Sequence, residues 1–365
     1  MMPRPPALAL LLALSLTAAC GEQRGPIVFG MAGPFDEGFG RANRRGAELA
    51  MRQINAANGI KGDSLLIRFM DDGGEGSRAA SIAQGFVEND SIVAVVGHVT
   101  SGAMLAAARV YDGQLTALAT TASSASLSGI SPWVFRVISS DVQNSVDLAK
   151  FATRLGKKRV AILYENNAYG RGLAENFRKA FPDSVIGLDP ISTSGDGAEI
   201  YVSWIAARRP DLVFVAGTER SGIAILREAR RQKVGAEFLG GDGWTGVAAD
   251  SSSEGALVGA PFTPLDPRPR AQEFVSAFRE AYGQDPDGNA ALAYDAVKLL
   301  ASAVEAVGRD RAKIREWLAT RTGESAHPGV TGTIAFDSLG DPAGQAFTMT
   351  RIVRGKLTVA ERGTP

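Results

Sequence analysis

The fold is decided by residues 27–57, where the run IVFGMA (27–32) is followed, after a short Gly/Pro turn, by FGRANRRGAELAMRQINAA (39–57). The first run is apolar, bounded by Pro26 and Gly33, and has the length of a strand buried on both faces. In the second run, apolar residues fall on one helical face and charged residues on the other, which is typical of an amphipathic helix. This stretch therefore predicts one strand–helix unit.

The same alternation recurs along most of the chain. Further strands are expected at 65–70, 92–96, 115–119, 133–137, 160–163, 185–188, 212–216 and 237–240. Helices are expected at 79–87, 101–110, 141–155, 172–181, 198–207 and 221–232. Such alternation indicates parallel sheets covered by helices on both faces. Because the series restarts after residue 137, we predict an α/β protein with two doubly wound parallel-sheet lobes.

A proline-rich segment is the expected crossing between the lobes. Residues 261–269, PFTPLDPRP, cannot continue a helix or a central strand because proline lacks the amide donor. Beyond it, helical faces over 274–282 and 292–307 are predicted to return to the first lobe, and 347–360 reads as a terminal hairpin. The predicted division, with a multi-strand hinge, is 26–139 plus 265–340 for lobe I and 140–264 plus 341–365 for lobe II.

The N-terminus predicts export. Residues 1–19 combine a short basic start, an apolar run and small residues, which is the order of a signal peptide. The run is about half of the roughly 20 apolar residues that span a membrane. Cys20, the only cysteine, ends the sequence LTAAC (16–20), which resembles a bacterial lipobox. That resemblance implies a diacylglycerol on Cys20, a tether at 20–25 and attachment to a membrane of the cell envelope or periplasm; the alternative is a thiol lost with an ordinary leader.

Composition and motifs argue against several function classes. The 39 basic and 39 acidic side chains balance, which removes the electrostatic argument for nucleic acid. The two histidines, His98 and His327, lie far apart and have no second metal ligand at useful spacing. Gly241–Gly246 spells a dinucleotide fingerprint but is followed by a Ser-rich stretch instead of a helix. Ser101 lies three residues from His98 but lacks a nucleophile elbow. We therefore expect neither cofactor nor catalysis.

Short sequence words spread over about Gly25 to Val359 carry a family resemblance. They are Gly33-Pro34 with Gly40, Gly46-Ala47 with Ala50, Ile54-Asn55 with Gly59-Ile60-Lys61-Gly62, Asp71-Asp72, Val96-Gly97-His98, Tyr169-Gly170 with Gly172-Leu173-Ala174, Pro210-Asp211, Gly240 with Asp242-Gly243-Trp244, and Tyr294-Asp295-Ala296. In this order and spacing the chain resembles a type I periplasmic binding protein of the leucine/isoleucine/valine-binding family.

The resemblance implies a receptor and not an enzyme. Members of the family deliver amino acids and related small molecules to ABC importers, so the expected partners are a small polar ligand and a membrane permease. The receptor would act as a monomer and close around its ligand by hinge bending. A different possibility is a lipid-anchored sensor or regulatory scaffold of the same fold, which docks to an envelope enzyme or a receptor.

Ser101 is the first candidate ligand-binding residue. It follows the strand at 92–96 and opens the next helix, and open parallel sheets bind ligands at the carboxyl ends of their strands. Its hydroxyl and the free amides of the first helical turn suit a carboxylate, and the resemblance implies that role. The alternative is that Thr100 or Ser101 is simply a helix N-cap.

The resemblance implies the remaining site residues. The backbone of Thr121 and the hydroxyl of Ser123 would complete the grip on an α-amino acid head group, unless residues 120–124 are only a polar loop. Asp242 would accept a hydrogen bond from the ligand ammonium, because a buried carboxylate without a cation is unfavourable; a solvated loop aspartate is the alternative. Tyr169 and Phe39 would wall the pocket, with core packing as the alternative for Phe39. Thr218-Glu219-Arg220 replaces family aromatics and predicts a charged pocket.

Overall fold

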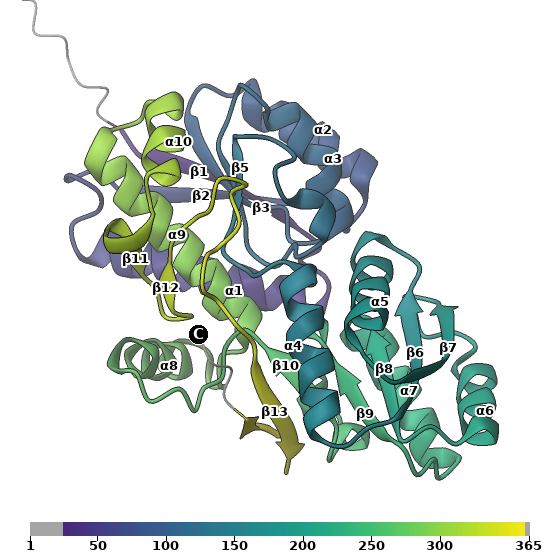
Figure 1. Ribbon diagram of the computed structural model, residues 1–365. Coiled ribbons are helices and arrows are strands. Elements are labelled where there is room, and N and C mark those ends of the chain that lie inside the picture. The colour runs from purple at the N-terminus through teal and green to yellow at the C-terminus, as the bar shows by residue number, and fades with distance from the viewer. Residues whose placement is uncertain (1–24, 362–365) are drawn as a thin grey trace, which may run out of the picture.

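The computed structural model describes residues 25–361, which form two α/β halves that lie side by side (Figure 1). The predicted signal peptide at 1–19 and Cys20 lie outside the described residues. Both halves are built on sheets whose strands are mostly parallel, with helices on both faces, so the predicted fold class is confirmed. In the part of the chain from 25 to 361, no helix combines the length and apolar character that a membrane span needs.

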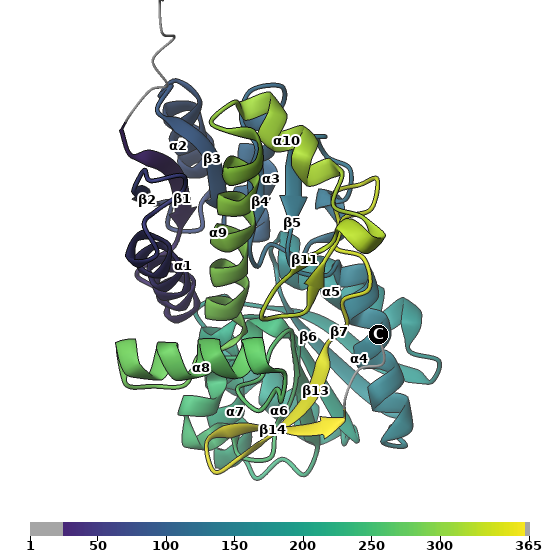
Figure 2. The same cartoon turned by 90° about the vertical axis from the view of Figure 1, so that its left-hand side faces the viewer.

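The first half holds a five-stranded parallel sheet in the order β2-β1-β3-β4-β5. Its strands are β1 (Ile27–Gly33), β2 (Leu65–Asp71), β3 (Ile92–Gly97), β4 (Ala117–Ala119) and β5 (Val134–Arg136). Its helices are α1 (Gly38–Ala56), α2 (Gly76–Val87), α3 (Ser101–Tyr111), α9 (Gly288–Val307) and α10 (Arg311–Ala319). Successive strand residues point to opposite faces, so Met31 packs with α1 and α9 while Ala32 packs with α2 and α3. Figure 2 shows α9 running along one face of this half.

The second half holds a seven-stranded sheet in the order β14-β13-β10-β9-β8-β6-β7. Its strands are β6 (Arg159–Glu165), β7 (Ser184–Ile191), β8 (Leu212–Ala216), β9 (Glu237–Gly240), β10 (Leu257–Ala260), β13 (Thr348–Val353) and β14 (Lys356–Glu361). Its helices are α4 (Asp141–Arg154), α5 (Ala168–Ala180), α6 (Ala198–Arg208) and α7 (Glu219–Arg231). Helices α4 and α5 cover one face and α6 and α7 the other. The strands β13 and β14 pair antiparallel, which confirms the predicted terminal hairpin.

Smaller elements complete the chain. Helix α8 (Pro269–Tyr282) packs against α1 and α9 through Phe274 and Phe278. Two short strands, β11 (His327–Pro328) and β12 (Thr333–Ile334), form a separate pair. Short 3₁₀ turns occupy 125–127, 242–244, 247–249, 251–253 and 323–325. Elements β10 and α10 were not predicted from the sequence; β10 has only four residues, between a Ser-rich loop and Pro261.

Within residues 25–361, the chain passes between the two sheets three times. The crossings are 137–140 between β5 and α4, 261–268 between β10 and α8, and 335–347 between β12 and β13. The proline-rich crossing therefore joins the two halves as predicted, and Pro269 begins α8 at a position that suits proline. We keep the predicted lobe boundaries as a proposal, and use the names lobe I and lobe II for the halves with the five-stranded and the seven-stranded sheet.

Candidate ligand-binding site

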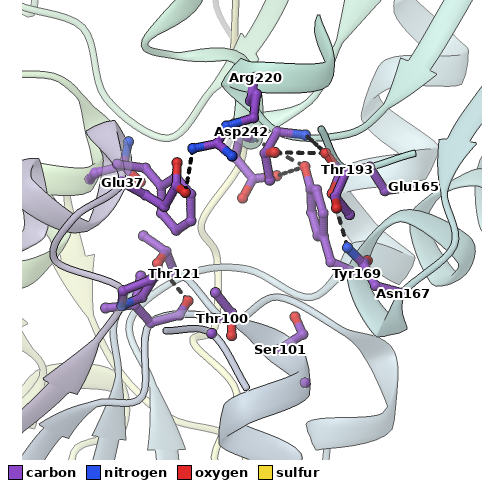
Figure 3. Close-up of a pocket in the computed structure, with 18 of the residues that line it drawn as sticks. Glu37, Thr100, Ser101, Thr121, Glu165, Asn167, Tyr169, Thr193, Arg220 and Asp242 are labelled. Atoms are coloured by element: carbon purple, nitrogen blue, oxygen red, sulfur yellow. Dashed lines mark hydrogen bonds and ion pairs between the residues drawn. The ribbon is translucent and has the colours of Figure 1, made fainter. Parts of the chain in front are cut away.

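A cavity of about 350 Å³ lies between the two lobes, beside residues that follow β1, β3 and β4 of lobe I and β6, β8 and β9 of lobe II. This is the position at which open α/β sheets bind ligands. Figure 3 shows side chains of both lobes that surround it. Five of the six predicted ligand-binding residues line the cavity, namely Phe39, Ser101, Thr121, Tyr169 and Asp242. The sixth, Ser123, is not part of the lining.

On the lobe I side, Ser101 is held so that its hydroxyl proton is free to donate. Thr100 is the N-cap of α3, since its side chain accepts a hydrogen bond from the Ala103 amide at 3.4 Å, so Ser101 is not the cap. Ser101 Oγ accepts a hydrogen bond from the Ser124 amide at 3.1 Å. Because that bond uses an acceptor lone pair, the hydroxyl can donate towards the cavity. Together with the free amides at the start of α3, it suits an anionic group.

Thr121 and Ser123 both follow β4, but only Thr121 lines the cavity. Thr121 lines the cavity, and its hydroxyl donates to the Val99 carbonyl at 2.9 Å, which ties the loops after β3 and β4 together. Ser123 is fully buried, and its carbonyl accepts a hydrogen bond from the Asp141 amide at 2.8 Å. The Ser123 side chain lies beside the Asp141 carboxylate. The structure thus places Ser123 next to Asp141 and away from the cavity lining.

On the lobe II side, half-buried Tyr169 and buried Asp242 form a hydrogen-bonded pair. The Tyr169 hydroxyl donates to Asp242 Oδ1 at 2.9 Å and accepts from the Gly243 amide at 3.1 Å. Asp242 is 7% exposed, which rules out a solvated loop aspartate. Burial raises the pKa of Asp242 to about 6, although the hydrogen bond from Tyr169 lowers it in part. Burial also raises the pKa of Tyr169 well above its usual 10, so the phenol remains a donor.

A glycine permits this close packing. A Cβ atom at Gly243 would lie 2.6 Å from the Gly217 carbonyl oxygen and 3.0 Å from the Tyr169 hydroxyl oxygen. Both distances are shorter than ordinary van der Waals contact, so a side chain here would displace the tyrosine. The Asp242-Gly243 word of the family resemblance therefore has a physical basis in the site.

Asp141, the first residue of α4, was not predicted as a site residue from the sequence. It is fully buried, and the side chains of Ser123 and Asn144 lie beside its carboxylate. Burial, and then the charge of Asp242, raise the pKa of Asp141 to about 8. Two buried carboxylates near each other need a cation or a shared proton. Asp141 directly follows Ser140, the N-cap of α4. An acidic residue is common there because it interacts favourably with the helix dipole, so the sequence did not mark Asp141 as a site residue.

Charged residues form another part of the lining, as the Thr218-Glu219-Arg220 word predicted. Arg220 of α7 makes an ion pair at 2.7 Å with Glu37, which precedes α1. This pair crosses from one lobe to the other, so the lobes are in contact around the cavity (Figure 3). Arg220 lies 60% exposed and Glu37 36% exposed, which places the pair at the rim.

Buried Glu165 organises the polar wall of lobe II and was also missed. Its Oε1 accepts hydrogen bonds from the Thr218 amide at 2.8 Å, the Thr218 hydroxyl at 2.7 Å and the Ser221 hydroxyl at 2.8 Å. Its Oε2 accepts from Asn167 at 2.9 Å. Both oxygens are thus satisfied within the protein, and Glu165 positions Thr218 and Asn167 at the cavity.

His98 has structural partners. It is fully buried, with Nδ1 2.7 Å from Asp72 and Nε2 2.9 Å from Tyr111, so it is not positioned to activate Ser101. Among the described residues, no group of three His, Cys, Asp or Glu side chains could hold a metal ion. In the Gly241–Gly246 word, a 3₁₀ turn occupies Asp242–Trp244 where a dinucleotide site needs an α-helix.

Comparisons with known proteins agree with this architecture. The model of the periplasmic binding protein family matches residues 26–356. The chain is 30% identical over 358 residues to an amino acid binding protein of Pseudomonas aeruginosa. This alignment covers 91% of this chain and 92% of the Pseudomonas protein. It is 30% identical over 349 residues to the Leu/Ile/Val-binding protein of Citrobacter freundii, with 92% of each chain covered. An ABC transporter substrate-binding protein from Desulfitobacterium hafniense, solved in complex with Leu, is 31% identical with a TM-score of 0.79 and covers 92% of this chain and 99% of that chain.

The two sheets, their three crossings and the cavity between them define a bilobal binding protein for a small molecule. The chain belongs to the periplasmic binding protein family, and within it to the Leu/Ile/Val-binding group. Its relatives are binding proteins of transporters and not enzymes.

Proposed function

We propose that this protein is the extracytoplasmic substrate-binding receptor of an ABC importer, and that it binds an amino acid or a related small polar molecule between its lobes. The names of its relatives, among them an amino acid binding protein and a Leu-bound transporter receptor, support the class. The ligand is then released to a membrane permease. Export and a lipid anchor at Cys20 would keep a monomeric receptor near that permease.

One observation carries the proposal. Ser101 with the start of α3 and the Tyr169–Asp242 pair line the same cavity from opposite lobes. The first suits an anion, and the second contains a buried carboxylate that has no cation paired with it among residues 25–361. An α-amino acid supplies a carboxylate and an ammonium at the spacing of one carbon atom. An acid without an amine would leave Asp242 unpaired, which is unfavourable in a buried site.

The mechanism follows from the position of the two groups. A ligand that contacts both lobes favours the closed form by the contacts that only this form provides. We expect the carboxylate to bind first to the Ser101 side, because those donors are held by lobe I alone. Closure then brings Asp242 and Tyr169 to the ammonium, and Asp141 behind them is stabilised by the same positive charge.

Isothermal titration calorimetry tests the proposal. The panel consists of the twenty amino acids, short amides and aromatic acids. We expect at least one amino acid to bind with a Kd in the micromolar range or below, while its des-amino analogue binds at least tenfold more weakly. Binding of aromatic acids alone, or of no member of the panel, would contradict an amino acid receptor. Genes for a permease and an ATPase beside this gene would separate an importer receptor from a sensor or scaffold.

A further inference from the structure

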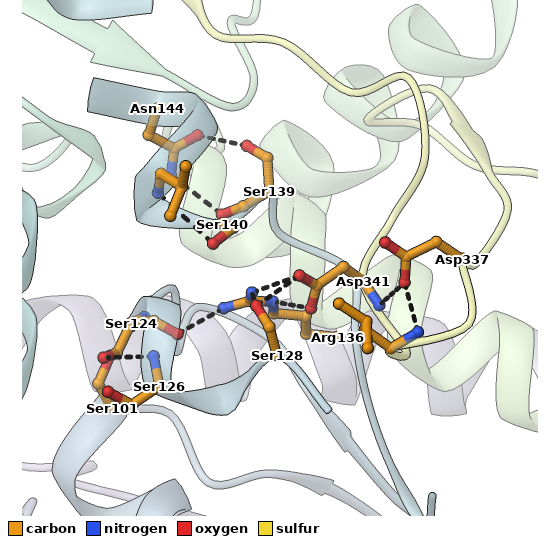
Figure 4. Close-up of polar contacts among 12 residues, drawn as sticks. Ser101, Ser124, Ser126, Ser128, Arg136, Ser139, Ser140, Asn144, Asp337 and Asp341 are labelled. Carbon is orange, nitrogen blue, oxygen red and sulfur yellow. Dashed lines mark hydrogen bonds and ion pairs between the residues drawn. The ribbon is translucent and has the colours of Figure 1, made fainter. Parts of the chain in front are cut away.

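A buried arginine outside the cavity joins three segments of the chain. Arg136 is the last residue of β5, the edge strand of the five-stranded sheet, and is only 2% exposed. Its guanidinium donates hydrogen bonds in three directions, to Ser124, Ser128 and Asp341 (Figure 4). A buried guanidinium with this many fixed partners holds segments together in one geometry.

In one direction Arg136 reaches the ligand site. Its Nη1 donates to the Ser124 carbonyl at 2.9 Å. The amide of the same residue, Ser124, donates to Ser101 Oγ at 3.1 Å. Arg136 therefore holds the residue that orients the Ser101 hydroxyl, although it does not line the cavity itself.

In the second direction Arg136 holds the third crossing. Its Nε and Nη2 donate to the two carboxylate oxygens of Asp341 at 2.7 and 2.8 Å, which is a bidentate ion pair. Ser128 takes part in both contacts, since its Oγ accepts from Nη2 at 2.7 Å and donates to Asp341 Oδ2 at 2.7 Å. The crossing is thus anchored to β5 before it continues to β13 of lobe II.

The loop that carries Asp341 is built to dock on β5. The Arg136 amide donates to the Gly340 carbonyl at 3.1 Å, and Asp337 Oδ1 accepts from the amides of Leu339 and Asp341 at 2.8 and 3.0 Å. A Cβ atom at Gly340 would lie 2.5 Å from the Val134 carbonyl oxygen, so only glycine allows this approach. Phe336 and Pro342 form a β-bridge, and the Ala343 amide donates to the Ala335 carbonyl at 2.8 Å, so we expect hinge bending in this crossing only at 344–347.

The first crossing leaves lobe I at the same place. Residues 137–140 follow Arg136 directly and lead into α4, where Asn144 donates to the Ser139 carbonyl at 3.0 Å. The Arg136 guanidinium thus contacts the third crossing and the loop behind Ser101, while the first crossing begins at the next residue of the chain (Figure 4). We propose that Arg136 is a positioning residue that fixes residues 121–128 of the ligand site to the roots of the first and third crossings.

This inference goes beyond the proposed function, because it concerns how the site is held and does not depend on which ligand binds. A purely structural ion pair predicts a different result from a positioning residue. Replacing a buried ion pair by apolar residues of similar size often preserves stability. The double variant Arg136→Met/Asp341→Leu should therefore regain most of the thermal stability that either single change removes. It cannot restore the hydrogen bond to the Ser124 carbonyl.

Hydrogen exchange of the ligand-free protein tests the proposal. In the double variant we expect amides in 121–128 to exchange at least tenfold faster than in the unmodified protein, while β1 and β3 keep their rates. Asp63→Asn is the matched control, because it removes an ion pair with Arg309 at 2.7 Å in the same lobe, away from the crossings. It should leave 121–128 unchanged.

Unchanged exchange of 121–128 in a stably folded double variant would overturn the proposal, as would an equal increase in the Asp63→Asn control. Should the double variant fail to fold, Arg136→Lys decides the question. Lysine keeps the charge but lacks the fork that reaches Ser124 and Asp341 together. We expect faster exchange of 121–128 in that variant, and wild-type exchange would again overturn the proposal. Because no ligand is added, these outcomes are independent of the amino acid titrations.

Discussion

The two sides of the cavity hold their polar groups by different physical means. On the lobe I side, neutral hydroxyls and helix amides are oriented by backbone contacts, as the Ser124 amide does for Ser101. On the lobe II side, buried carboxylates dominate, and Asp242 has a raised pKa because burial disfavours its charge. A neutral donor that is already oriented can bind a ligand with little loss of free energy for desolvation. A buried carboxylate instead gains most when a cation arrives, so we expect ligand affinity to depend more strongly on lobe II.

The largest expected effect tests that asymmetry directly. Asp242→Ala removes the acceptor for the ligand ammonium, and loss of a charged hydrogen bond amounts to about 3 kcal/mol, or roughly a hundredfold in Kd. Calorimetry with the tightest amino acid of the panel measures this change. Asp285→Asn on the exposed surface, where Asp285 pairs with Arg279, is the control and should not alter Kd. An unchanged Kd for Asp242→Ala would remove this residue from the site.

The pH dependence of binding sharpens the comparison. Burial raises the pKa of Asp242 to about 6, so the free protein protonates this carboxyl as the pH falls below that value. An ammonium ligand binds the ionised form, and therefore affinity should fall by about tenfold between pH 7 and pH 5. The lobe I donors do not titrate in this range. Calorimetry between pH 7 and pH 5 should show this fall in affinity, and the Asp242→Asn variant should not show it. If affinity falls equally in Asp242→Asn, a group other than Asp242 causes the pH dependence.

A smaller effect is expected on the lobe I side. Ser101→Ala removes one hydroxyl donor but leaves the amides at the start of α3, so Kd should rise by about tenfold, equivalent to about 1.4 kcal/mol. Asp310→Ala removes the N-cap of α10, which does not line the cavity, and serves as the comparison. It should lower the melting temperature, since an N-cap contributes about 1 kcal/mol, with little change in Kd. A Ser101→Ala effect larger than that of Asp242→Ala would reverse the asymmetry.

The smallest effect concerns the rim, where the two sides meet. Arg220→Ala removes the Glu37–Arg220 pair between the lobes. Because the pair is partly exposed, we expect a loss of about 0.2–1 kcal/mol in closed-form stability, or roughly a fivefold rise in Kd at most, which high salt reduces further. Arg231→Ala is a matched control on the same helix, since Arg231 pairs with Glu228 of α7 itself. Equal effects of both changes would show that the rim pair does not contribute to closure.

Much of the fold was predictable because strands and helices follow from the spacing of apolar residues over short stretches of sequence. The predicted strands at 212–216 and 237–240 coincide with β8 and β9. The first, LVFVA, is a continuous apolar run, which is the signature of a strand buried on both faces. Element β10 was missed because four residues between a Ser-rich loop and a proline are too few to show a period. For the site, Ser101 was predictable from its position after a strand and before a helix.

By itself, the sequence determined the alternation of strands and helices, the two sheets, and the strand ends at which Ser101 and Asp242 stand, because these follow from local pattern and chain order. Only the tertiary structure decided which polar groups share a neighbourhood. It placed Asp141 beside Asp242 and moved Ser123 out of the cavity lining, and it joined Arg136 to a residue 205 positions away. Burial and partners of this kind depend on contacts between distant segments, which no local pattern encodes.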